Sequence, residues 1–144
     1  MTFVASSGTI AAVTINDSNA FDLKALTTTG NLTVTAGGAV TDSGTLVIPG
    51  TATISASGQA VTLDDSSNNF GTLAVTGANV AVTDTNAIVL GAATVTGTYG
   101  ITAGGAITDS GTQEIAGVTT IEAGSGNDIT LNTCLLYTSD AADE

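Results

Sequence analysis

Basic side chains are almost missing from this chain. Lys24 is the only lysine or arginine among 144 residues, and there is no histidine. Because 13 residues are acidic, the formal net charge is −12. A nucleic-acid-binding protein needs many cations to displace phosphate counterions, so the composition argues strongly against nucleic acid as a partner. The acidic balance also disfavours docking onto anionic lipid.

Aromatic residues (3%), charged residues (10%) and proline (Pro49 alone) are scarce as well, and the first two fractions are low for a globular enzyme. The mean hydropathy is nevertheless +0.40, which does not fit a disordered chain. Valine, isoleucine, leucine and alanine dominate the apolar residues and occur with many threonines and 18 glycines. This composition is typical of strands and turns. No apolar run is long enough to span a bilayer.

The only cysteine, Cys134, opens a segment that breaks this texture. Residues 134–144 resemble the in-frame translation of a transposase adapter used in short-read sequencing libraries. We therefore expect a non-native, disordered tail, and a natural part that has no cysteine, has a net charge of −9 and continues past Thr133. The first residues lack the basic and apolar regions of a signal peptide, so we interpret Met1 as an internal start.

A block of the sequence occurs twice. Residues 19–56 align without a gap onto residues 86–123, an offset of 67, and more than half of the aligned positions are identical. Short alternations of apolar and polar residues recur every seven to ten positions and are separated by Gly and Asx turns. This period-two pattern predicts short strands with one face inward, and duplication is typical of stacked structural units.

A right-handed parallel β-helix explains the pattern better than an antiparallel sandwich, because each coil then packs against a near-copy. If the offset of 67 corresponds to three coils, each coil takes about 22 residues. Residues 1–133 then form about six coils. Narrow coils filled by small aliphatic side chains also account for the scarcity of aromatics. We see no capping segment at either end, so we expect an uncapped fragment of a longer rod.

Residues 30–44, 76–84 and 128–132 resemble the repeats of large filamentous-haemagglutinin-like adhesins, a likeness that covers nearly all of residues 8–133. The resemblance implies a secreted repeat region, exported by two-partner secretion or as an autotransporter and displayed on the bacterial cell surface. It also implies as partners the rest of the same polypeptide, an outer-membrane transporter during export, and a host or neighbouring-cell glycan or protein bound through other regions.

Two groups of acidic residues could suggest catalysis. Asp42 and Asp109 begin Asp-Ser-Gly-Thr segments like the paired loops of aspartic proteases, which need two carboxylates close enough to share a proton. Three coils would separate them by about 14 Å, so we interpret both as Asx turns. The adjacent pair Asp64 and Asp65 could serve a β-helix polysaccharide hydrolase, but solvated turn residues are the simpler interpretation.

Three other patterns suggest binding or stacking. Residues 123–128 partly match a calcium-binding glycine-rich repeat, but one copy supplies too few ligands. Thr-x-Thr pairs, such as the one from Thr33 to Thr35, resemble ice-binding solenoids, but Gly100 interrupts the expected recurrence. Four asparagines are candidates for amide ladders at one corner: Asn19, Asn68, Asn69 and Asn86.

We therefore predict a non-catalytic shaft segment of a secreted bacterial surface adhesin. The prediction includes no catalytic, cofactor-binding or metal-binding residue and no cofactor. A β-solenoid module that binds glycan or ice is the main alternative, and a β-helix enzyme acting on polysaccharides is a weaker one.

Overall fold

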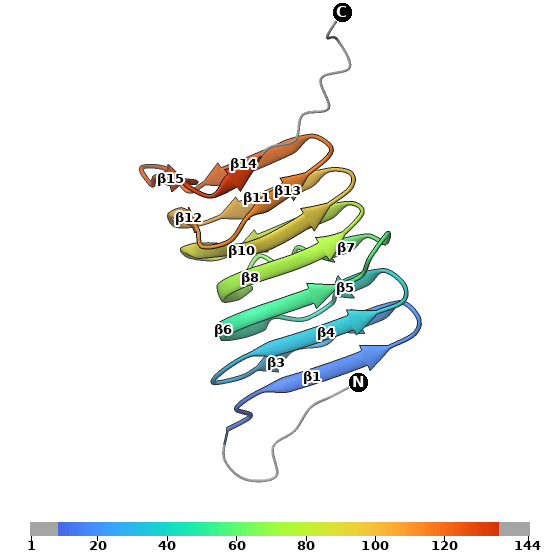
Figure 1. Ribbon diagram of the computed structural model, residues 1–144. Coiled ribbons are helices and arrows are strands. Elements are labelled where there is room, and N and C mark those ends of the chain that lie inside the picture. The colour runs from blue at the N-terminus through green and yellow to red at the C-terminus, as the bar shows by residue number, and fades with distance from the viewer. Residues whose placement is uncertain (1–8, 136–144) are drawn as a thin grey trace, which may run out of the picture.

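The computed structural model describes residues 9–135, and every regular element in that range is a β-strand (Figure 1). All strand pairs are parallel, and the chain winds upward in stacked right-handed coils. The all-β, parallel β-helix of about six coils predicted from the sequence is thereby confirmed. Within residues 9–135 there is no helix that could cross a membrane.

Each coil contributes one strand segment to each of three sides, which we name sides A, B and C. Side A contains β1 (Val13–Asp17), β4 (Leu32–Ala36), residues 51–55 of β6 (Leu46–Ser55), residues 72–77 of β8 (Asn69–Gly77), residues 93–95 of β10 (Ile88–Val95), β13 (Gln113–Ile115) and β16 (Cys134–Leu135). Side B contains β2 (Phe21–Leu23), β5 (Val40–Asp42), β7 (Val61–Leu63), β9 (Val80–Asp84), β11 (Tyr99–Ala103) and β14 (Thr119–Ala123). Side C contains β3 (Leu26–Thr27), the first residues of β6, β8 and β10, β12 (Ile107–Asp109) and β15 (Ile129–Thr130).

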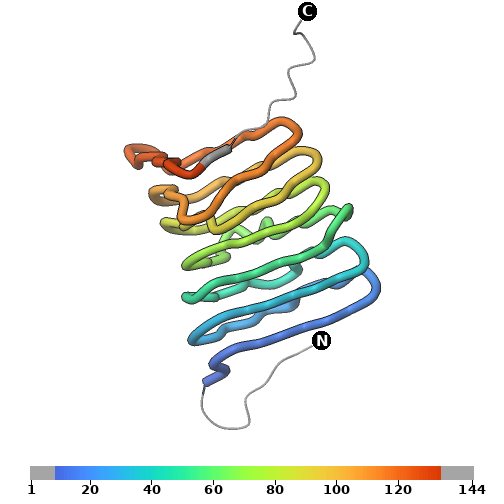
Figure 2. The backbone as a smooth tube through the Cα atoms, viewed as in Figure 1, coloured from blue at the N-terminus to red at the C-terminus, as the bar shows by residue number. Residues whose placement is uncertain are grey.

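Sides A and C belong to one sheet because three long strands run through both of them. Strands β6, β8 and β10 pass from side C to side A without a break, and register shifts between Ile48 and Thr51 and between Leu90 and Ala93 mark the bend. Side B forms a separate six-stranded sheet. The smooth backbone trace shows the coils lying directly above one another (Figure 2).

The coil is shorter than the sequence suggested. Val13 pairs with Leu32, Leu32 with Ala52 and Ala52 with Leu73, so Leu73 lies three rungs above Val13 on side A. The residue 67 positions after Val13 is Val80, which lies beyond Leu73 and begins a strand of side B. The coil length expected from the offset is therefore wrong, because the offset is longer than three coils.

The two copies of the duplicated block consequently lie on different sides. β4 on side A has its copy in β11 on side B, and β5 on side B has its copy in β12 on side C. Residues 46–48 of β6, on side C, have their copy in β13 on side A. The copy is thus ten strand segments further along, or three coils and one side, and the two copies of the block do not stack directly on each other.

The lumen is filled by inward-facing aliphatic side chains, as expected. Leu32, Ala52 and Leu73 form one stacked column on side A, and each is at most 1% exposed. Burial of a Val, Leu or Ile side chain contributes about 1.5–3 kcal/mol. Since each coil touches only its neighbours, this packing is what joins one rung to the next.

Glycine at the corners allows adjacent coils to come close. The amide of Gly37 donates to the carbonyl of Asp17 (2.9 Å), and the amide of its copy, Gly104, donates to the carbonyl of Asp84 (2.9 Å). A Cβ atom at Gly104 would overlap the carbonyl oxygen of Thr85 on the coil beneath. The local contacts of the two copies therefore match, although they occur at different corners.

The segment predicted to be a non-native tail begins inside the described part of the chain. Cys134 and Leu135 form strand β16, which pairs with Gln113 and Glu114 of β13. The rest of that segment, residues 136–144, lies outside the described residues, as does the proposed internal start at Met1.

Candidate functional site

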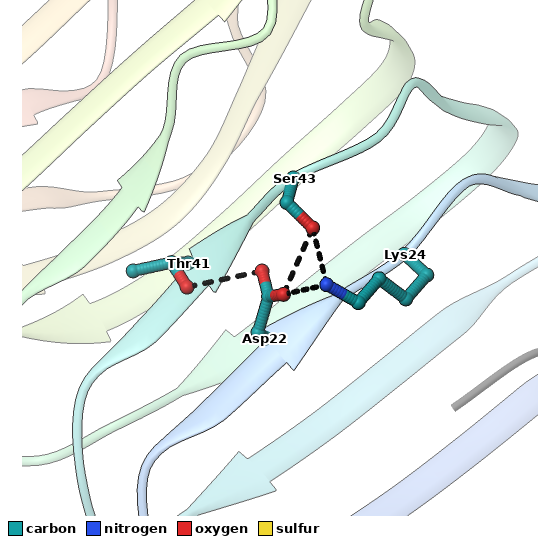
Figure 3. Close-up of polar contacts among 4 residues, drawn as sticks. All are labelled: Asp22, Lys24, Thr41 and Ser43. Carbon is teal, nitrogen blue, oxygen red and sulfur yellow. Dashed lines mark hydrogen bonds and ion pairs between the residues drawn. The ribbon is translucent and has the colours of Figure 1, made fainter.

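An exposed polar cluster lies on side B, where β2 passes beneath β5 (Figure 3). Asp22 and Thr41 are register partners, and Lys24 and Ser43 directly follow these strands. Lys24 Nζ forms an ion pair with Asp22 Oδ2 and donates a hydrogen bond to Ser43 Oγ (2.7 Å). The hydroxyls of Ser43 and Thr41 donate to Asp22 Oδ2 and Oδ1 at 2.8 and 3.2 Å.

Electrostatics in this cluster favour the ionised carboxylate. The Lys24 ammonium group is the first cause that lowers the pKa of Asp22 below its usual 3.8, and the Ser43 hydroxyl is the second. Ser43 donates its proton to the carboxylate, while Lys24 is engaged as an ammonium donor, so the trio is not arranged as a base and a nucleophile. The cluster joins two adjacent coils instead.

Comparison of the two copies shows that the cluster is particular to the first one. The positions equivalent to Asp22 and Lys24 are Val89 and Gly91, whereas the Thr and Ser positions are retained as Thr108 and Ser110. Asp22 and Lys24 therefore add this link between coils in the first copy only. The sequence singles out Lys24 as the sole base, but its ion pair with Asp22 was missed. The opposite charges of these two residues, two positions apart in an extended segment, could have indicated it.

The two Asp-Ser-Gly-Thr segments are separated by the fold. Asp42 ends β5 on side B, and Asp109 ends β12 on side C. The interpretation as turn residues agrees with their contacts, but the estimate that placed them three coils apart on one column was wrong, because their coils are shorter than assumed.

Each of these aspartates binds backbone amides of the following coil. Asp42 Oδ1 accepts from the amide of Asp64 (3.0 Å), and Asp109 Oδ1 accepts from the amide of Asn132 (2.8 Å). Asp109 Oδ2 also accepts from the amide and hydroxyl of Thr133, both at 2.7 Å. The Thr133 hydroxyl is the first cause that lowers the pKa of Asp109, so its contribution to stability is present above pH 3.8 and is lost as the pH falls.

The adjacent acids Asp64 and Asp65 have separate hydrogen-bond partners. Asp64 uses its amide to bind Asp42, as described above. Asp65 Oδ1 accepts from the amide of Ser67 (2.9 Å) and from the hydroxyl of Thr45 (3.3 Å). These contacts are those of a hydrogen-bonded loop between side B and side C.

The glycine-rich stretch at residues 123–128 forms a tight turn. Gly126 has a φ of +81°, and the amide and side-chain Nδ2 of Asn127 both donate to the carbonyl of Gly124 at 3.0 Å. Gly58, one position before the residue equivalent to Gly126, has a similar φ of +72°. Among the described residues, no group of three or more His, Cys, Asp or Glu side chains could hold a metal ion.

Uncharged and mostly hydroxyl-bearing side chains recur on one face, although Thr-x-Thr itself is not repeated on each of its first four rungs. On side A, Thr33 pairs with Thr14 below and Thr53 above, and Thr35 pairs with Asn16 below and Ser55 above. Ala74 and Thr76 continue the two columns on the fourth rung. Gly100 does not interrupt them, because it lies on side B. We name these eight outward residues of the first four rungs the side A columns.

Of the four asparagines expected to stack, only Asn68 and Asn86 share a corner. Asn19 lies between sides A and B, whereas Asn68 and Asn86 lie between sides B and C. Asn68 is fully buried; its Oδ1 accepts from the amide of Leu46 (2.8 Å), and its Nδ2 donates to Asp42 (2.6 Å). The amide-ladder interpretation is therefore wrong for these residues.

One carboxyl group is buried, and the sequence did not single it out. Asp84 is 2% exposed; its Oδ2 accepts from the amide of Phe70 (2.6 Å), and its Oδ1 accepts from the amide of Asn86 (2.9 Å). Burial raises the pKa of Asp84 above 3.8, and the two amides oppose that shift. Its copy, Asp17, accepts the amide of Asn19 in the same way (2.8 Å).

We expect Asp84 to give a pH-dependent contribution with the opposite sign to that of Asp109. Because its pKa is raised in the folded state, this contribution is full below pH 3.8 and is lost as the pH rises through the folded pKa. Relative to Asp84→Asn, the wild type should gain free energy of unfolding as the pH is lowered through that range. Urea unfolding of both proteins at a series of pH values checks this, and a difference that does not change with pH would contradict it.

A polar pair inside the lumen was also missed. Tyr99 and Gln113 are each 1% exposed, and the Tyr99 hydroxyl donates to Gln113 Oε1 (3.3 Å). Gln113 Nε2 donates to the carbonyls of Gly91 (2.5 Å) and Gly111 (2.8 Å). The equivalent residues of the first copy are Leu32 and Leu46, so two positions that are apolar in the first copy are both polar in the second. Comparison of the two copies could have found this pair.

Replacing both members of this pair should destabilise the protein by less than the sum of the two single replacements. Gln113→Leu removes the donor to two buried carbonyls and a partner of Tyr99, and we expect a loss of about 1–3 kcal/mol. The double variant Tyr99→Leu/Gln113→Leu recreates the Leu pair of the first copy. It should be more stable than the sum of the single variants predicts, with a coupling of about 0.5–3 kcal/mol. Denaturant unfolding of the four proteins measures that coupling, and strictly additive effects would refute it.

Comparison with known proteins gives one result that bears on the repeat. No curated protein and no solved structure matches the chain. Two consecutive segments, residues 10–76 and 77–134, match the family described as repeats of unknown function, DUF5649. The spacing between the starts of the two matches equals the offset of the duplicated block, and together the matches cover most of the sequence. The chain therefore belongs to the DUF5649 repeat family.

Proposed function

We propose that this chain is a structural shaft segment of a secreted bacterial surface adhesin and has no catalytic role. One observation carries the proposal: the coils stack from β1 to β16 around a lumen filled with close-packed side chains. Parallel strand ladders over a packed lumen make a stiff, elongated body. Such a body suits a segment that holds another region of the same polypeptide away from a cell.

The polar groups support a mechanical role. The contacts of Asp22, Asp42 and Asp109 all reach a neighbouring coil, so these side chains fasten one rung to the next. The resemblance of the repeats to filamentous-haemagglutinin-like adhesins supplies the rest of the proposal. It includes export by two-partner secretion or as an autotransporter, and contact with a glycan or protein of another cell through other regions.

Localisation of the native protein tests this function. An antibody raised against this chain should label intact source cells, and external protease should remove the label. The full gene should encode a signal peptide and a secretion domain upstream of the repeats. Labelling that appears only after cell lysis would overturn the proposal.

The side A columns favour a second candidate, a module that binds a neutral glycan or ice. Their eight side chains are all uncharged on a protein of net charge −12, and six carry a hydroxyl group. Rungs about 4.8 Å apart arrange them in a regular lattice. Thr53→Glu on side A should then abolish co-sedimentation with insoluble polysaccharide or thermal hysteresis. Thr62→Glu on side B is the matched control and should leave both unchanged. Absence of both activities in the wild type would reject this candidate.

A further inference from the structure

We infer that the unit multiplied in this family is a set of ten strand segments, so that each added repeat turns its outward side chains by one side of the coil. By the phase of a repeat we mean its rotation about the shaft axis relative to the repeat before it. The inference stands apart from the adhesin proposal, because it depends only on how the repeats fold.

The two copies in this chain carry the observation. Leu32–Ala36 (β4) lies on side A, and its copy, Tyr99–Ala103 (β11), lies on side B. The side A columns move with it. Thr33 and Thr53 are neighbours on side A, and their copies, Gly100 and Thr120, are neighbours on side B. The strand segments of residues 13–55 and their equivalents in residues 80–122 therefore follow one another in the same order, one side further round.

The contacts explain why a repeat need not be a whole number of coils. Except at the bend between β8 and β10, where Val89 and Leu90 pair with Thr72 and Leu73, a segment binds the segments three places before and after it, which form the adjacent rungs of the same side. This pairing between segments three places apart is the same whether a repeat begins on side A, B or C, provided that the three corners accept the same sequence. Two of the corners do so here: the amide of Gly38 donates to the carbonyl of Asn19 (3.0 Å) at the corner between sides A and B, and the amide of Gly105 donates to that of Asn86 (2.8 Å) at the corner between sides B and C.

This phase has a consequence for the surface of a longer array. Since ten segments are one more than three full coils, equivalent residues of successive repeats point from successive sides. Three repeats, which make ten coils, return the pattern to its starting side. A surface feature of the repeat is thus presented in three directions around the shaft and is not collected into one flat stripe.

Paired spin labels test the phase in the chain itself. Cys134→Ser is the background for two double-cysteine variants at exposed threonines. Thr35 and Thr94 are three rungs apart in one column of side A, so their backbones should be about 14 Å apart. Thr35 and Thr102 are equivalent residues on sides A and B, and we expect a clearly longer label distance. The reverse order of the two distances would overturn the inference.

An inserted repeat tests whether the unit propagates. An extra copy of residues 10–76 placed between Thr76 and Gly77 keeps every segment in contact with the segments three places away. We expect a cooperatively unfolding β-protein that is longer by small-angle scattering. An insertion of residues 13–72, three whole coils, is the control. If the three-coil insertion folds and the full-repeat insertion does not, the coil is the unit and the inference fails.

Discussion

Gly104→Ala should be among the most damaging single-methyl additions to this protein. The glycine lies at the corner after β11, where its amide binds the carbonyl of Asp84 on the coil beneath. A Cβ atom there would overlap the backbone carbonyl of Thr85, a group that cannot move without displacing the coil. We expect a loss of about 3 kcal/mol, in the range seen when a close-packed site is overfilled. Urea unfolding followed by far-ultraviolet circular dichroism measures it.

Gly100→Ala is the matched control on the same strand. A Cβ atom at Gly100 would meet only the carbonyl oxygen of Val80, at 3.7 Å, which is an ordinary contact. Since alanine also restricts the unfolded chain, this variant should be neutral or stabilising by up to about 1 kcal/mol. Equal effects of the two substitutions would show that close approach of the coils does not explain the glycine at position 104.

The fold could be predicted from sequence because its cause is repeated many times. Alternating Val, Ile and Leu, separated by Gly and Asx turns, require short half-buried strands, and the duplicated block favours coils over a sandwich. The side on which each copy lies could not be predicted. The duplication offset divides about as well into three longer coils as into ten short segments, and only the strand register separates these possibilities.

The special side chains were harder to find for a different reason. Asp17 and Asp84 occupy equivalent positions in similar sequence, yet Asp84 is buried above Phe70, whereas Asp17 lies on the first strand that the structure describes. Burial therefore depends on the rung beneath, which local sequence does not specify. Tyr99 and Gln113 likewise look like ordinary strand residues until the coil brings them together across the lumen.

Phe70→Ala should produce the largest loss of stability that we predict. Phe70 is 0% exposed, pairs with Ile48 on the rung below and fills the lumen near the bend between sides C and A. Its removal leaves a cavity that a neighbouring coil can fill only by breaking its own register, so we expect a loss of about 3–5 kcal/mol. Asn69→Ala, one residue earlier and facing outward, should cost no more than about 0.5 kcal/mol. Denaturant unfolding of both variants measures the contrast, and comparable losses at the two positions would mean that the inward and outward faces of β8 have been assigned wrongly.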